Sequence, residues 1–62
     1  MNIERIKELM KQKGITQKEL GEAAGVSQPF IDNILRGLKI PSVATLKAMA
    51  VKLGCTVDEL LN

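Results

Sequence analysis

The 62-residue chain is long enough for one small domain only, and 45% of its residues are hydrophobic. With one Phe and no Trp or Tyr, the core must consist of aliphatic side chains and Met, which suits packed helices better than sheets. A single Cys and no His exclude an internal disulfide and disfavour the usual metal sites, and the net charge of +2 permits a polyanionic partner without requiring one.

Two helices are predicted in the first part of the chain. The first covers about residues 3–13, ends at Gly14, and has apolar residues at helical spacing at Ile3, Ile6, Leu9 and Met10. The second begins at "TQKE", in which Thr16 as N-cap and Glu19 form a capping box, each satisfying a backbone donor of the other. Gly25 is expected to end this second helix in a left-handed cap.

The joint between the second and third predicted helices is very short. Ser27 is expected to cap the third helix, which runs to about Arg36, so only Gly25 and Val26 separate the two helices. Such a joint forces the helices across each other, as in a helix-turn-helix unit. A glycine inside a helix costs roughly 1 kcal/mol of stability relative to alanine. Gly21 therefore has two explanations. Either the third helix passes too close to leave room for a Cβ, or glycine has replaced alanine by neutral drift.

Two further helices complete the predicted all-α fold. The fourth follows Pro41 with Ser42 as N-cap, extends to Leu53, and places on its core face Val43, Leu46, Met49, Ala50 and Leu53. "TVDE" repeats the capping-box pattern and starts a short terminal helix over residues 57–61. No repeat or linker interrupts the pattern, so residues 1–62 are predicted to form one compact domain of five short helices.

The segment "TQKELGEAAGVSQPFIDNILRG" resembles the helix-turn-helix of the phage repressor and Cro proteins, the XRE family. The matching positions are Gln17, Leu20, Gly21, Gly25, Val26, Ser27, Ile31, Ile34 and Gly37. The similarity extends through "PSVATLKAMAVKLGCTVDELL" and "RIKELMKQKGIT", and so covers essentially the whole chain. It implies a lambda-repressor-like fold and sequence-specific binding of double-stranded DNA, usually as a homodimer and usually for transcriptional control, as in a repressor.

The resemblance implies that the third helix enters the major groove while the second crosses the DNA backbone. On a helical wheel Ile31 and Ile34 point to the core, and five positions are left outward: Gln28, Pro29, Asp32, Asn33 and Arg36. The first four of these are the predicted base contacts. Glutamine and asparagine side chains bond bidentately to adenine, and arginine suits guanine or phosphate. Contacts with the DNA backbone are predicted at Gln17, Lys18, Ser27, Arg36 and Lys39.

Several features of the third helix favour a rival hypothesis. Pro29 removes a donor from the reading face and offers only an apolar surface, for example to a thymine methyl. Asp32 either repels phosphates or simply pairs with Arg36, four residues later. Leu35 and Leu38 stand where the resembling family commonly has polar or basic residues. The alternative function is a protein-interaction or assembly module that keeps the helix-turn-helix fold without binding DNA.

The fourth helix carries a second apolar stripe where an exposed helix face would normally be polar. We therefore expect a self-association surface at Ala44, Ala48, Val51, Cys55 and Leu61. An enzyme is disfavoured, because no His, no suitably paired carboxylates and no glycine-rich phosphate loop are present, and nothing near Cys55 would activate its thiol. No metal, cofactor, small-molecule ligand or membrane partner is expected, and the chain is predicted to be cytoplasmic.

Overall fold

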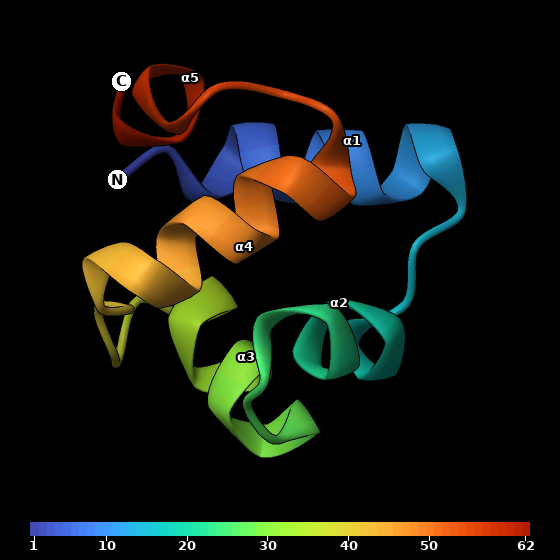
Figure 1. Ribbon diagram of the computed structural model, residues 1–62, viewed down its shortest axis with the longest axis vertical. Coiled ribbons are helices and arrows are strands. Elements are labelled where there is room, and N and C mark those ends of the chain that lie inside the picture. Colours follow the sequence, from blue (N-terminus) through green and yellow to red (C-terminus); the bar gives the residue numbers. More distant parts are fainter.

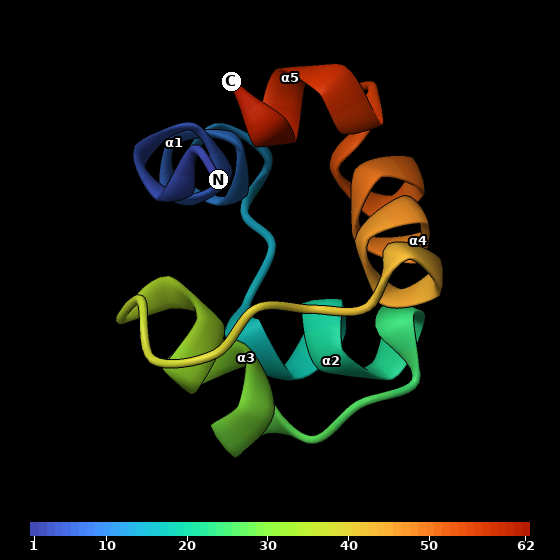
Figure 2. The same cartoon turned by 90° about the vertical axis from the view of Figure 1, so that its left-hand side faces the viewer.

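The computed structural model describes residues 1–62 and contains five helices and no strands, as predicted (Figure 1). The helices are α1 Ile3–Lys13, α2 Gln17–Ala24, α3 Gln28–Leu35, α4 Val43–Leu53 and α5 Val57–Leu61. Helices α2 and α3 lie at one end of the molecule, and α5 lies at the other end beside both termini (Figures 1 and 2). None of the helices has the length and apolar character that a membrane crossing requires.

The helix boundaries follow from local capping, largely at the predicted residues. The hydroxyls of Thr16, Ser27 and Ser42 each accept a hydrogen bond from a backbone N–H one turn into their helix, at 3.1, 3.2 and 3.2 Å. The capping box of α2 is complete, because the Glu19 carboxylate accepts from the backbone N–H of Thr16 at 3.1 Å. This bond lowers the pKa of Glu19. The N-cap of α1, which the sequence analysis missed, is Asn2.

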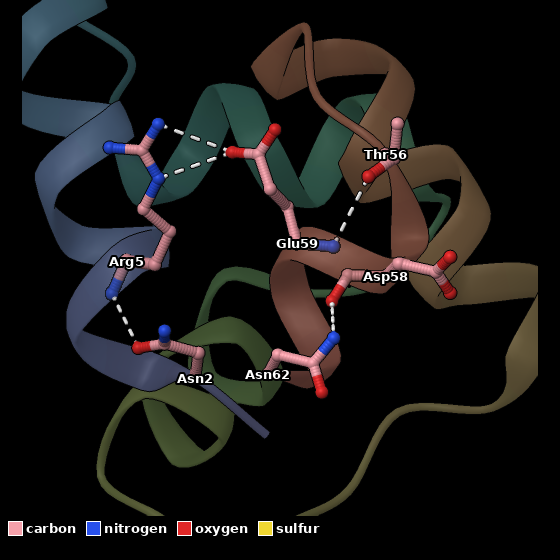
Figure 3. A pocket seen from close by; sticks show the side chains of 6 residues that line it. All are labelled: Asn2, Arg5, Thr56, Asp58, Glu59 and Asn62. Carbon is pink, nitrogen blue, oxygen red and sulfur yellow. Dashed lines mark hydrogen bonds and ion pairs between the residues drawn. The ribbon is translucent and has the colours of Figure 1, made fainter.

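The predicted second capping box is wrong in one half. The hydroxyl of Thr56 accepts from the backbone N–H of Glu59 at 3.1 Å, but the Glu59 side chain does not return to Thr56. It pairs instead with the Arg5 guanidinium of α1 at 3.2 Å, which raises the pKa of Arg5 (Figure 3). A charge-assisted bond to another helix has replaced a local bond to a neutral N–H.

The core is a single cluster of twelve buried hydrophobic residues drawn from all five helices: Ile6, Leu9, Met10, Leu20, Ile31, Ile34, Leu35, Leu46, Met49, Ala50, Leu53 and Leu60. Phe30 is half-buried against this cluster. The prediction that Val43 faces the core is wrong, because its residue surface is 68% exposed. Val43 is the first residue of α4, and the helix meets the core only from Leu46 onward.

Gly21 marks the closest approach inside the helix-turn-helix unit. A Cβ at this position would lie 2.8 Å from the carbonyl oxygen of Val26 and 3.4 Å from the backbone of Ser27. The turn folds back on α2 because Gly25 adopts a left-handed conformation and the Val26 N–H donates to the Gly21 carbonyl at 2.9 Å. The predicted lack of space is confirmed, but the obstructing atoms belong to the turn and the N-cap residue rather than to the body of α3.

Replacing Ser27 with alanine is expected to lower the free energy of unfolding by about 1 kcal/mol, because the Phe30 N–H loses its only capping partner. Ser27→Asn, which keeps a capping oxygen, is the matched control and should remain close to the wild type. Urea denaturation of the three proteins measures the difference. An unchanged midpoint for Ser27→Ala would show that the cap contributes nothing.

Candidate nucleic-acid interface

Three of the four predicted base-contact residues lie together on one exposed surface. Gln28, Pro29 and Asp32, which we call the α3 face, line a shallow hollow of about 410 Å³ together with Gln17 from α2. Gln17 and Gln28 are the first residues of their helices, so the crossing of α2 and α3 brings the two helix starts to the same hollow. Pro29 is the second residue of α3, where its missing N–H leaves no intrahelical bond unmade.

A second hollow of about 350 Å³ adjoins the first and shares Gln17 and Asp32 with it. Its other lining residues are Lys7, Met10, Leu35 and Arg36, contributed by α1 and by the end of α3. Lys7 is not among the contact residues predicted from the sequence. No sequence spacing connects Lys7 with Arg36, because only the packing of α1 against α3 brings them to one surface.

Asp32 and Arg36 form an ion pair at 3.7 Å, which confirms the predicted local pairing one turn apart on α3. Both side chains are substantially exposed, so the pair stabilises the fold little. The pair has a larger effect on the surface potential, because a cation compensates the negative charge of Asp32 where the two hollows meet. Lys7 adds a further positive charge at the second hollow.

The remaining predicted contact residues do not line either hollow. Lys18 is exposed in the first turn of α2, and Lys39 is exposed between α3 and α4. Ser27 is exposed, with its hydroxyl engaged as the cap of α3. Asn33 is half-buried, and its backbone carbonyl accepts a hydrogen bond from the backbone N–H of Leu38 at 2.8 Å. These four residues therefore lie outside the two hollows.

A polar hollow lies between the start of α1 and α5. It is lined by Asn2, Arg5, Thr56, Asp58, Glu59 and Asn62, and the Arg5–Glu59 ion pair joins α1 to α5 (Figure 3). The backbone N–H of Asn2 also donates to the Leu60 carbonyl at 2.6 Å. Helix α5 lies at the opposite end of the molecule from α3 (Figure 1). The bonds at this hollow attach the last helix to the first.

The residues predicted for self-association differ in exposure. Val51 is 82% exposed and Ala44 is also exposed, whereas Ala48 and Cys55 are half-buried. Burial raises the pKa of the Cys55 thiol, which disfavours the reactive thiolate. Leu61 is exposed and lines an apolar hollow of about 400 Å³ whose other lining residues are Met1, Ile40, Pro41, Val43, Leu46 and Val57.

A family model described as helix-turn-helix matches residues 6–60, which is most of the chain. The chain belongs to the helix-turn-helix family. The match confirms the resemblance that the sequence of α2, α3 and the turn between them indicated. The matched residues of this helix-turn-helix protein include every core residue and all residues that line the two hollows beside α3.

Individual relatives agree with this assignment. The helix-turn-helix protein is 38% identical over 59 residues to the HTH-type transcriptional regulator DdrOP3 of Deinococcus deserti, covering 95% of this chain and 46% of that protein. It is 38% identical over 60 residues to the regulator SinR of Bacillus licheniformis, covering 95% and 54%. A crystal structure of SinR, the master regulator for biofilm formation, in complex with DNA matches with a TM-score of 0.87 and 36% identity, covering both chains completely. The chain thus spans about half the length of these curated relatives.

Proposed function

We propose that this helix-turn-helix protein binds double-stranded DNA sequence-specifically and acts as a small transcriptional regulator of the repressor type. In this proposal α3 lies in the major groove and α2 crosses the phosphate backbone. The observation that carries it is the α3 face, where Gln28, Pro29 and Asp32 meet Gln17 at one exposed hollow. The similarity to SinR, whose structure was solved in complex with DNA, supports DNA as the partner.

Charge placement supports a polyanionic partner at this end of the molecule. Gln17 stands at the N-terminus of α2, where unpaired backbone N–H groups and the helix dipole favour a phosphate. Lys7 and Arg36 line the hollow beside it, and Lys18 and Lys39 are exposed on the adjoining segments. We propose that these side chains, with Ser27, position the duplex, and that base contacts come from the α3 face and from Asn33. The action is binding rather than catalysis, in the cytoplasm.

Titration of the purified protein with duplexes tests this function. Fragments of the DNA upstream of its own coding sequence should bind more tightly than a scrambled duplex, and both affinities should fall as salt rises, because phosphate contacts release counterions. Absence of any duplex binding at low salt would contradict DNA binding. The assembly module, for which the exposed apolar side chains provide some support, would then be the better proposal.

We also propose that the protein acts as a homodimer. The interface consists of the α4 stripe, which is Ala44, Ala48 and Val51, together with Cys55 and Leu61. Val51 is the most exposed large apolar side chain of α4, and it does not pack into the core. Two copies related by a two-fold axis would present two α3 helices to two half-sites of one duplex.

Val51→Glu is expected to shift the protein toward monomer, because a charge would have to be buried between two copies. Sedimentation equilibrium measures the shift. Leu38→Glu is the matched control, since Leu38 is 62% exposed but lies after α3, outside both the α4 stripe and the apolar hollow that Leu61 lines, and it should leave association unchanged. The reverse pattern would exclude Val51 from the interface, and a wild type that stays monomeric at hundreds of micromolar would contradict self-association.

A further inference from the structure

Two of the three side chains of the α3 face have no hydrogen-bond donor. Pro29 is exposed and presents only the methylene groups of its ring. Asp32 presents an ionised carboxylate, which accepts hydrogen bonds and donates none. Gln28 alone both donates and accepts. The centre of the α3 face therefore fits a partner that offers one donor and one apolar group.

Pro29 and Asp32 are close enough to act on neighbouring base pairs. They are three residues apart on α3, which places them one above the other on the same side of the helix. Both line the 410 Å³ hollow. Side chains at this spacing start about 5–6 Å apart at their Cβ atoms. Stacked base pairs are separated by about 3.4 Å, so the two side chains reach adjacent pairs or the two sides of one step.

The chemistry of base edges in the major groove selects among the four bases. Guanine presents two acceptors and thymine presents an acceptor oxygen, so both repel a carboxylate. Adenine presents an amino donor beside the acceptor N7, whereas cytosine presents its N4 amino group alone. A carboxylate that reads a base with no donor group of its own therefore favours cytosine. The only methyl group on any base edge in this groove is the C5-methyl of thymine, which matches the apolar Pro29 ring.

Arg36 makes a carboxylate tolerable at this position. Its guanidinium lies 3.7 Å from the Asp32 carboxylate on the side of the second hollow. A lone negative charge would be repelled by the phosphates on both sides of the groove. With Arg36 beside it, Asp32 carries compensated charge into the groove and keeps its acceptor oxygens available for an amino group.

We propose that Asp32 and Pro29 together make the protein specific for a step of adjacent cytosine and thymine. The Asp32 carboxylate accepts from the cytosine N4 amino group, and the Pro29 ring contacts the methyl of the neighbouring thymine. This assignment rests on the proposed DNA binding and adds to it the chemical identity of two adjacent bases that the α3 face reads.

The test begins with selection of preferred duplexes from a random pool by the wild type. Fluorescence anisotropy then gives affinities for duplexes carrying each of the four bases at every position, and for duplexes in which each thymine is replaced by deoxyuridine. The wild type should lose about 5- to 30-fold when one particular cytosine is changed. It should lose about 3- to 5-fold when the thymine beside that cytosine loses its methyl group.

Three variants identify the side chains responsible. Asp32→Ala should bind all four bases at the cytosine position within about 3-fold of one another. Asp32→Asn should change the preference to adenine, which an amide reads through N6 and N7. Pro29→Ser should bind thymine and deoxyuridine duplexes equally. Asp58→Ala, which removes an exposed acidic group on α5 at the far end of the molecule, is the matched control and should keep the wild-type preferences.

The outcomes separate this inference from the proposed function. Specific binding by the wild type, with the cytosine preference intact in Asp32→Ala or with no effect of deoxyuridine on the wild type, would overturn the inference and leave DNA binding standing. An equal loss of preference in Asp58→Ala would also overturn it, because overall charge would then be the cause. A wild type that binds no duplex would overturn the proposed function together with this inference. Thermal melting checks that every variant is folded.

Discussion

Replacing Gly21 with alanine is expected to lower the free energy of unfolding by about 1–2 kcal/mol. The added Cβ would lie 2.8 Å from the Val26 carbonyl oxygen, a backbone atom that moves only if the whole turn moves. Overpacking of this kind costs about 1–3 kcal/mol, and a backbone clash belongs in the upper part of that range. The better helix propensity of alanine offsets roughly 1 kcal/mol of the cost.

The exposed Ala23 on the same helix provides the matched control. Ala23→Gly should lower the free energy of unfolding by roughly 1 kcal/mol through propensity alone, so alanine is better than glycine at position 23 and worse at position 21. Urea denaturation of both variants measures the two changes in the free energy of unfolding. A Gly21→Ala variant that is more stable than the wild type would show that the turn moves away at little cost.

Gln28→Ala and Asn33→Ala are each expected to weaken binding to a preferred duplex by about 1–3 kcal/mol, because each amide can bond to two atoms of one base. Binding to a scrambled duplex should change much less, since phosphate contacts dominate it. The two side chains differ in exposure. The Gln28 side chain is exposed in the hollow of the α3 face, whereas Asn33 is half-buried outside that hollow.

Lys39→Ala provides the opposite control. It should weaken binding to both duplexes alike and reduce the slope of the logarithm of affinity against the logarithm of salt concentration by about one unit. Anisotropy titrations of the three variants against both duplexes at two or more salt concentrations distinguish the cases. Equal losses on the two duplexes for Gln28→Ala would show that this side chain does not read bases.

Helix boundaries were predictable from the sequence because their causes are local. Thr16, Ser27 and Ser42 each accept a hydrogen bond from a backbone N–H three residues later. The glycines that end α1, α2 and α4 all adopt the left-handed conformation. The placement of Gln28, Pro29 and Asp32 on one face follows from helical spacing alone. These features need no knowledge of the rest of the molecule.

Apart from the local N-cap at Asn2, the wrong or missing predictions depend on contacts between distant segments. Glu59 leaves its capping box because Arg5 of α1 lies opposite it, and the local pattern contains no sign of that competitor. Val43 fits the apolar period of α4, but only the position of α4 relative to the other helices shows that the first residue lies beyond the core. Lys7 joins the second hollow through the packing of α1 on α3.

The bonds between the first and last helices determine where the protein tolerates chemical attachment. The Asn2 N–H donates to the Leu60 carbonyl, and Arg5 pairs with Glu59, so both chain ends are held together at the end of the molecule opposite α3 (Figure 1). Asn62 is exposed there. A fluorophore or an immobilisation tag coupled at Asn62 therefore lies away from α2 and α3, and the side chains of the α3 face remain unobstructed for titration.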